Sequence, residues 1–137
     1  MKKIKEEIRN IASQYSLQII YVFGSRAKEA LDLVEDRIEH FPSTLADLDI
    51  GVKPAKPLTV EEKVKIAIFF EDLFDVPRVD LVVLPEAPVF LAFEIVTGEI
   101  LYMQDSTYEA EYQLYIMRQA ADLLPYERVK QRMIMGD

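Results

Sequence analysis

Two aspartates separated by a single residue, Asp47 and Asp49, are the first candidates for chemistry in this sequence. They stand in the apolar stretch ADLDIGV (residues 46–52), which predicts a β-strand. Residues two apart in a strand point to the same face, so Leu48 and Ile50 are expected to face the core. Two ionised carboxylates about 5 Å apart repel by about 3 kcal/mol at an effective dielectric constant of about 20. The pair could simply face water at the start of a strand, or it could bind Mg²⁺, which favours one or two protein carboxylates.

A third aspartate, Asp80, interrupts the apolar run 79–84. A charge inside such a strand is costly unless it is paired or bound to a metal ion. If this strand lies beside the strand of Asp47, three carboxylates converge, as a two-metal phosphoryl or nucleotidyl transfer site requires. The alternative is a salt bridge from Asp80 to Arg78 or Arg26.

Gly24 and Ser25 follow an apolar strand and precede a predicted helix. Glycine permits a tight turn and close backbone approach, while a helix N-terminus offers free N–H groups to a phosphate. The alternative is that Ser25 only caps the helix after a glycine turn. A nucleophilic serine is not favoured, since the single histidine, His40, is expected at the surface and no Gly-x-Ser-x-Gly motif is present.

The elements that must position these residues alternate between helix and strand, which predicts an α/β (α+β) fold with a small central sheet. Thr59 and Glu62 form a predicted capping box, as do Ser106 and Glu109. A helix ending at Gly98 and a break at Pro125 are also expected. The predicted helices cover residues 2–15, 25–33, 60–74, 90–96, 106–124 and 127–135, the strands cover 17–23, 47–53, 78–84 and 99–103, and residues 34–46 are expected to extend the second helix and then form a loop.

Two helices carry apolar patterns that predict contacts. In the helix 60–74 the expected core positions are Val64, Ala67, Ile68, Leu73 and Phe74. Tyr108, Tyr112 and Tyr115 share one stripe of the helix 106–124 and are expected in the core or at a protein interface, with a modification site as the minor alternative.

Composition limits the classes of function. The chain of 137 residues suits one domain, with a core at about 17–103 and a helical extension at about 105–135. The net charge of -8 argues against stable nucleic-acid binding but fits docking to a basic protein partner. There is no cysteine, no signal-peptide pattern and no apolar run of 18 residues, so a cytoplasmic protein without membrane spans is expected.

Three segments together resemble the polymerase-β-like nucleotidyltransferase superfamily in its minimal, MNT-type form: FGSRA at 23–27, ADLDIGV at 46–52 and VDLV at 79–82. The resemblance implies that Gly24 and Ser25, with Arg26 beside them, contact the triphosphate of ATP. It also implies that Asp47, Asp49 and Asp80 bind Mg²⁺ and form the catalytic set, with Asp80 as general base.

The C-terminal part, EIVTGEILY at 94–102 followed by Asp105 and a helix with tyrosines, is similar to MntA-family antitoxins. Proteins of that family are partners of HEPN-domain toxins, and members transfer AMP from ATP to a tyrosine of the toxin. The resemblance therefore implies an AMP-transferring antitoxin with a HEPN-type partner. Two alternatives stay open: an antitoxin that inhibits by docking without catalysis, and nucleotidyl transfer to a small hydroxylated molecule. Homo-oligomerisation is also left open.

The sequence departs from the family pattern in its spacing. Residues 26–46 separate Ser25 from Asp47, about twice the usual length, and Ala46 stands where the family often has serine. The extra length falls in the polar segment 34–46, which could be looped out or could accompany a change of substrate or a loss of activity. Because all three acidic positions are present, an active enzyme is favoured.

Overall fold

A four-stranded mixed sheet, in the order β3-β2-β1-β4, forms the centre of the computed structural model, which describes residues 3–41 and 47–135. Strand β1 is antiparallel to both β2 and β4, and β2 is parallel to β3. In chain order the elements are α1 (Lys3–Gln14), β1 (Leu17–Phe23), α2 (Ala27–Val34), β2 (Leu48–Pro54), α3 (Val60–Phe74), β3 (Val79–Val83), the short 3-10 helix η1 (Leu84–Glu86), α4 (Val89–Val96), β4 (Glu99–Met103) and α5 (Ser106–Met135).

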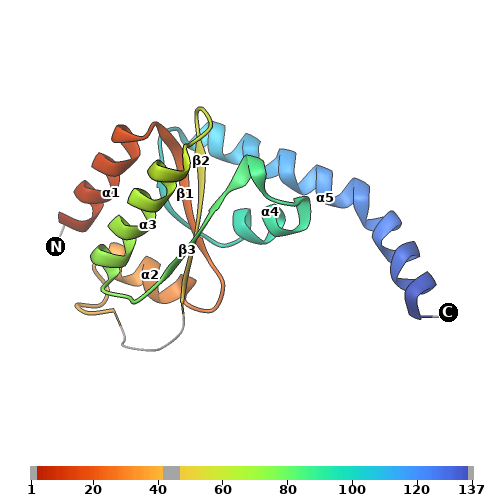
Figure 1. Cartoon of the computed structure of the whole chain (residues 1–137), viewed down its shortest axis with the longest axis horizontal. Coiled ribbons are helices and arrows are strands. Elements are labelled where there is room, and N and C mark those ends of the chain that lie inside the picture. Colours follow the sequence, from red (N-terminus) through yellow and green to blue (C-terminus); the bar gives the residue numbers. More distant parts are fainter. Residues whose placement is uncertain (1–2, 42–46, 136–137) are drawn as a thin grey trace.

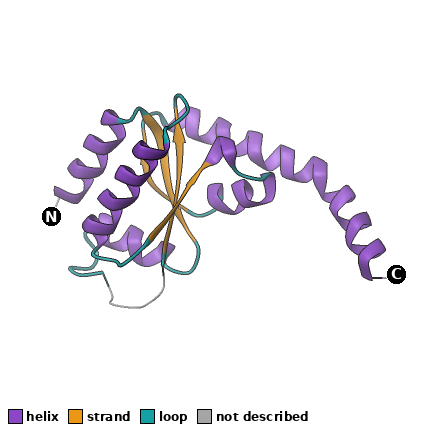
Figure 2. Cartoon of the chain, viewed as in Figure 1, coloured by secondary structure: helices purple, strands orange, loops and turns teal. Residues whose placement is uncertain are grey.

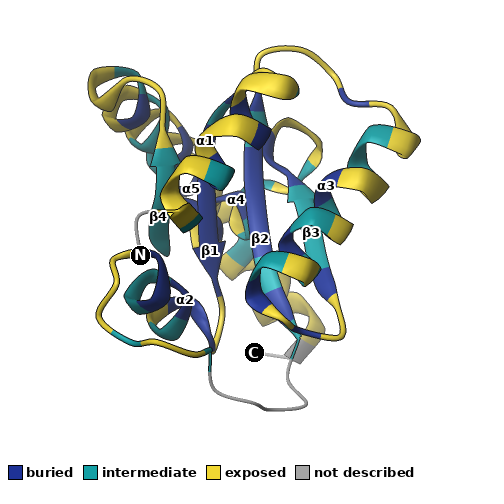
Figure 3. Ribbon diagram, turned by 90° about the vertical axis from the view of Figure 1, so that its left-hand side faces the viewer, coloured by how far each residue is buried: buried dark blue, intermediate teal, exposed yellow. Residues whose placement is uncertain are grey.

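Helices cover both faces of the sheet (Figures 1 and 2). Alternate residues of β1 divide between two cores: Ile20 and Val22 pack with α1, α2 and α3, whereas Ile19 and Tyr21 pack with α4 and α5. Figure 3 shows β1 and β2 buried over most of their length, while the edge strands β3 and β4 are more exposed. The mixed α/β architecture and all four predicted strands are therefore confirmed, with strand ends shifted by one residue or less. No helix in the described part of the chain is both long and apolar enough to cross a membrane.

The expected helical extension after residue 34 is wrong. Helix α2 ends at Val34, and Asp36 takes a left-handed conformation with a φ of 63°. The N–H of Arg37 then donates to the carbonyl of Asp32, which closes the end of the helix. Aspartate tolerates this conformation better than most residues, so Asp36 stops the helix that the polar sequence could have continued. Residues 42–46, including Ala46, lie outside the described residues.

Helix α3 confirms its predicted range and its capping box, with Thr59 Oγ1 accepting from the N–H of Glu62 at 3.1 Å. The prediction that Val64 and Ile68 lie in the core is wrong, because both side chains are about half exposed. Phe74 is buried as predicted, and it is joined by Ile66 and Phe70, which were not among the predicted core residues. The helix has more apolar residues than one face can bury, so the pattern alone could not select the stripe.

Gly98 was expected to cap the end of helix α4, but the C-cap is Thr97 and Gly98 has no positive φ. Helix α4 closes at Thr97, whose hydroxyl donates to the carbonyls of Phe93 and Glu94. A glycine is needed at 98 for another reason: a Cβ there would lie 2.6 Å from the carbonyl oxygen of Val22 on β1. The glycine thus allows the chain to pass close to the central strand.

Helix α5 differs from the prediction at its start and at Pro125. Asp105 caps it, accepting from the N–H of Thr107 at 2.9 Å, so the expected capping box of Ser106 and Glu109 is wrong. The helix also runs unbroken through Pro125. The residues around this proline are exposed, so the carbonyl that loses its N–H partner can be hydrated. The C-terminal half of α5 extends beyond the sheet and the other helices (Figure 1).

Glu109 does not cap helix α5 but links this helix to the core. Its buried carboxylate accepts from the hydroxyl of Tyr21 at 2.7 Å and from the amide of Gln113 at 3.1 Å. Gln113 also donates to the carbonyl of Val96 at 2.9 Å. Burial, reinforced by Glu109, raises the pKa of Tyr21 far above its usual value, so this phenol stays protonated and remains a donor. One polar network thus joins β1, α4 and α5.

We predict that Tyr21→Phe lowers the free energy of unfolding by about 1–3 kcal/mol, because it removes the donor from a buried carboxylate. Urea denaturation measures this loss. Tyr115→Phe is the matched control: the hydroxyl of Tyr115 is also hydrogen-bonded, to Gln119, but its side chain is exposed, so a change within about 0.5 kcal/mol is expected. Equal losses in the two variants would show that the buried bond has no special importance.

Candidate functional site

The predicted site residues meet at the end of the sheet where β1 finishes and β2 and β3 begin. Phe23, the last residue of β1, lies opposite Asp49 of β2. Asp49 in turn lies opposite Asp80 of β3. The parallel pairing of β2 and β3 thus brings together two carboxylates that are far apart in the sequence. The predicted neighbouring of the two strands is therefore present and pairs Asp49 with Asp80, while the joint action of all three aspartates stays a prediction.

Both carboxylates lie on the side of the sheet that carries α4. The pleat sends Leu48 and Ile50 into the opposite core, where both are fully buried, as predicted. On the α4 side of β2, a Cβ at Gly51 would collide with Ile95 of α4. Asp49 precedes Gly51 by two residues and therefore shares this side of the sheet.

Asp47 lies one residue before β2, although the predicted strand 47–53 included it. The following residue is fixed to the neighbouring strand, since the N–H of Leu48 donates to the carbonyl of Arg78 at 3.2 Å. The side chain of Asp47 is partly exposed, like that of Asp80. Asp80 is therefore not the buried charge that its apolar neighbours suggested, because β3 is an edge strand.

The carboxylates influence one another. Burial raises the pKa of Asp49 above its ordinary value of 3.8, and the negative charges of Asp80, Asp47 and Glu94 raise it further. Glu94 was not singled out as a site residue from the sequence. The available signal was its position as the single charge in the otherwise apolar helix α4, VFLAFEIV.

Arg78 is the cation of this cluster. Its Nη2 lies 3.0 Å from Oδ1 of Asp80, and its Nε lies 3.8 Å from Oδ2 of Asp47. The salt bridge that the sequence offered as an alternative for Asp80 is thus formed by Arg78. The convergence of carboxylates and the salt bridge, weighed as alternatives from the sequence, occur together.

Gly24 and Ser25 form the turn between β1 and α2. Gly24 has a φ of 81°, and a Cβ there would lie 2.5 Å from Oδ2 of Asp49, so glycine is required on both counts. Ser25 is exposed in the turn, and the N–H of Ala27 donates to the carbonyl of Gly24 at 3.3 Å. Arg26, not Ser25, stands at the N-cap of α2 and makes no capping bond with its side chain. The exposed turn thus lies directly beside Asp49.

Arg26 is placed differently from the other predicted residues. Its side chain is 3% exposed, its guanidinium lies 4.0 Å above the ring of Phe41, and its Nε lies 3.5 Å from Glu29. The ring of Phe41 also packs edge-on against Phe74 of α3 at 5.3 Å. In this arrangement Arg26 joins α2 to the segment after it, and its contact with a phosphate stays a prediction.

The donor set fits a hard divalent cation. All its side-chain donors are carboxylate oxygens, the ligands that Mg²⁺ prefers, and a cation would offset the negative charges of Asp80, Asp47 and Glu94 that act on Asp49. Within residues 3–41 and 47–135, however, no three acidic, histidine or cysteine side chains are arranged so that they could already hold a metal ion. Asp47 and Asp80 instead contact Arg78.

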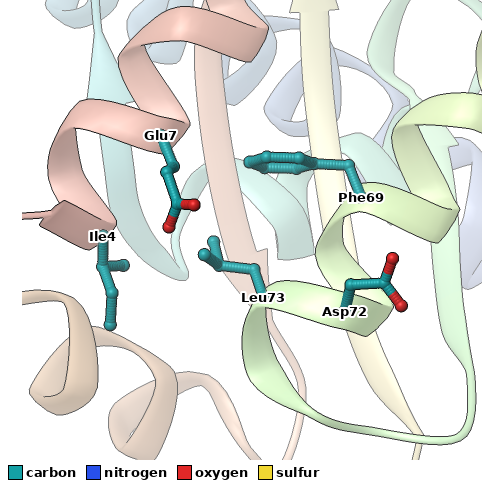
Figure 4. Close-up of a pocket in the computed structure, with 5 residues that line it drawn as sticks. All are labelled: Ile4, Glu7, Phe69, Asp72 and Leu73. Carbon is teal, nitrogen blue, oxygen red and sulfur yellow. The ribbon is translucent and has the colours of Figure 1, made fainter.

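A separate hollow of about 280 Å³ lies between α1 and α3 (Figure 4). It is lined by Ile4 and Glu7 of α1 and by Phe69, Asp72 and Leu73 of α3. None of these residues belongs to the candidate site, and the carboxylate of Asp72 points away from Leu73 in the view. The candidate functional site is therefore the end of the sheet that carries Asp49, not this hollow.

Comparison with solved structures shows where this fold occurs. A chain of a toxin–antitoxin structure with AMP-PNP superimposes with a TM-score of 0.74 and 22% identity, covering 96% of this chain and 98% of that one. A chain of the toxin–antitoxin MntA-HepT gives 0.70 and 20%, covering 98% and 99%. A chain of a tri-AMPylated Shewanella oneidensis HEPN toxin in complex with MNT antitoxin gives 0.70 and 22%, also covering 98% and 99%. At this identity, the likeness establishes the fold.

Sequence comparison establishes the family. No curated protein matches the chain. The family model described as polymerase beta, nucleotidyltransferase, matches residues 6–107, which include all four strands and the three aspartates. The expected relationship is confirmed: this chain belongs to the polymerase β nucleotidyltransferase family.

Proposed function

We propose that this protein transfers AMP from ATP to a tyrosine hydroxyl of a HEPN-type toxin and thereby acts as its antitoxin. The observation that carries the proposal is the pairing of Asp49 with Asp80 beside the Gly24-Ser25 turn. This arrangement joins a set of carboxylates to an exposed turn at the start of a helix. Nucleotidyl transfer needs both parts, one to hold cations and one to hold phosphate.

The turn is suited to the β- and γ-phosphates of ATP. Gly24 has no side chain to obstruct a phosphate, and Ser25 is exposed and offers its hydroxyl and N–H. The first turn of α2 follows at once and adds the positive end of its dipole. A phosphate held at this point would lie next to Asp49.

Asp47, Asp49 and Asp80 would hold Mg²⁺, which when bound neutralises charge that develops on the α-phosphate. In the transfer, a bond forms between the tyrosine oxygen and the α-phosphorus of ATP. The bond from that phosphorus to the oxygen bridging to the β-phosphate breaks, and pyrophosphate leaves. We assign Asp80 as the base that accepts the hydroxyl proton, because its side chain is exposed enough to meet an incoming protein.

The choice of acceptor rests on the structural relatives and on charge. One relative is described as an MNT antitoxin in complex with a tri-AMPylated HEPN toxin, and another structure contains AMP-PNP. The net charge of -8 favours a partner with a basic surface. We expect the reaction in the cytoplasm, where ATP is available.

We predict that the purified chain, incubated with ATP, Mg²⁺ and a HEPN-type toxin as its partner, adds one or more AMP groups to that toxin. Asp49→Asn should abolish the added mass, because it removes a carboxylate from the centre of the cluster. Intact-protein mass spectrometry measures the shift. Asp72→Asn, which changes an exposed acid on α3 outside the site, should transfer AMP as the unaltered chain does.

Other outcomes would redirect the assignment. A partner that is inhibited but carries no added mass would identify a docking antitoxin without catalysis. AMP transfer to small hydroxylated molecules, with none to the protein, would identify the small-molecule alternative. Full transfer by a folded Asp49→Asn variant would remove the carboxylate cluster from the mechanism.

We predict that the same Asp49→Asn variant is more thermally stable than the unaltered chain at pH 7. The pKa of Asp49 is raised on folding, so the stability linked to its proton is present below its ordinary pKa of 3.8 and is lost as the pH rises through the folded-state pKa. Asparagine removes the repulsion at neutral pH. Melting temperatures should therefore differ at pH 7 and converge toward pH 4, with Asp72→Asn as control. A variant less stable at pH 7 would contradict the repulsion.

A further inference from the structure

We propose that Arg78 is an internal counter-ion that positions Asp47 and Asp80 and is displaced from them when a divalent cation binds. This inference rests on the proposed function, since it concerns how the same carboxylates receive their metal. Arg78 belongs neither to the group of three aspartates nor to the Gly24-Ser25 turn, so it is an additional residue of the proposed site.

The contacts place one guanidinium against two of the three aspartates. Both Nε and Nη2 of Arg78 lie close to Oδ1 of Asp80, at 3.1 and 3.0 Å, and Nε lies 3.8 Å from Oδ2 of Asp47. Because both nitrogens approach a single oxygen of Asp80, the pair lacks the two-oxygen fork that makes an arginine–carboxylate bridge strong. The pair with Asp47 is longer still. Arg78 therefore holds both side chains loosely.

Backbone and side chain of Arg78 have different freedom. Its carbonyl accepts from the N–H of Leu48 at 3.2 Å, which fixes the main chain against the start of β2. Its side chain is 68% exposed. The guanidinium can therefore turn into solvent without disturbing the pairing of β2 and β3. The strand that carries Asp80 stays in register while the counter-ion moves.

The position of Asp49 explains why a divalent cation would displace Arg78 from the carboxylates. Among the described residues it forms no ion pair, although it lies opposite Asp80 in the sheet. Arg78 brings one positive charge to Asp47 and Asp80 and leaves Asp49 uncompensated. A divalent ion brings two charges in a small volume and prefers carboxylate oxygens as ligands. Its affinity is nevertheless reduced by the need to displace Arg78.

The test is the affinity of the full chain for Mn²⁺, measured by isothermal titration calorimetry without nucleotide. Arg78→Gln should bind Mn²⁺ about threefold more tightly, the size of effect expected from losing one exposed ion pair. Arg78→Lys keeps the charge and should stay close to the unaltered chain. Arg37→Gln is the matched control, because Arg37 forms a comparable exposed pair with Asp32 outside the site; its affinity should not change.

Melting temperatures with and without Mn²⁺ distinguish a counter-ion role of Arg78 from a role in packing. With EDTA present, Arg78→Gln should melt at a lower temperature than the unaltered chain, because its carboxylates lack a cation. Saturating Mn²⁺ should remove this difference, whereas a loss due to damaged packing would persist.

Unchanged or weaker Mn²⁺ affinity in Arg78→Gln would overturn the inference, as would absence of binding in both proteins. The AMP-transfer assay judges the proposed function separately. Active transfer together with unchanged Mn²⁺ affinity in Arg78→Gln would reject the counter-ion and leave the enzyme assignment standing.

Discussion

Repulsion between carboxylates at one end of the sheet is the constraint around which this structure is organised. Asp49 lies across from Asp80, and burial together with the negative charges of Asp80, Asp47 and Glu94 raises the pKa of Asp49. Such a cluster opposes folding at neutral pH unless positive charge enters it. The cluster therefore carries a local cost in folding free energy. Such a cost is common where a site must bind a cation.

The rest of the chain keeps this cluster in place. Buried apolar residues of β1 and β2 fix the register, since a shift by one residue would turn Asp49 into the core. Gly24 leaves room for the Asp49 carboxylate, and Gly51 lets α4 approach β2. On the same side, the Tyr21–Glu109 bond secures α5 to β1. Asp49 and Asp80 are therefore placed on strands, while Asp47 and the Gly24-Ser25 turn lie at strand ends.

Much of this was predictable from the sequence because local patterns determine it. The four strands, the helix 60–74 with its cap, and the aspartates with the Gly24-Ser25 turn all follow from periodicity and motif. The edge position of β3 was not predictable, since an apolar strand can lie at an edge or in the centre. For the same reason the exposure of Asp80 and its contact with Arg78 depended on tertiary structure. Glu94 joined the cluster only through the packing of α4 on β2.

In the proposed site Asp47, Asp49 and Asp80 receive a cation, while the Gly24-Ser25 turn beside them receives the phosphates of ATP. A crystal structure of the chain grown with Mn²⁺ and a non-hydrolysable ATP analogue tests it most directly, because the anomalous scattering of manganese locates the ion. We expect manganese between the Asp47 and Asp49 carboxylates, with the triphosphate against Gly24 and Ser25 and with Arg78 turned away. Manganese or nucleotide bound elsewhere, with Arg78 still on Asp80, would contradict it.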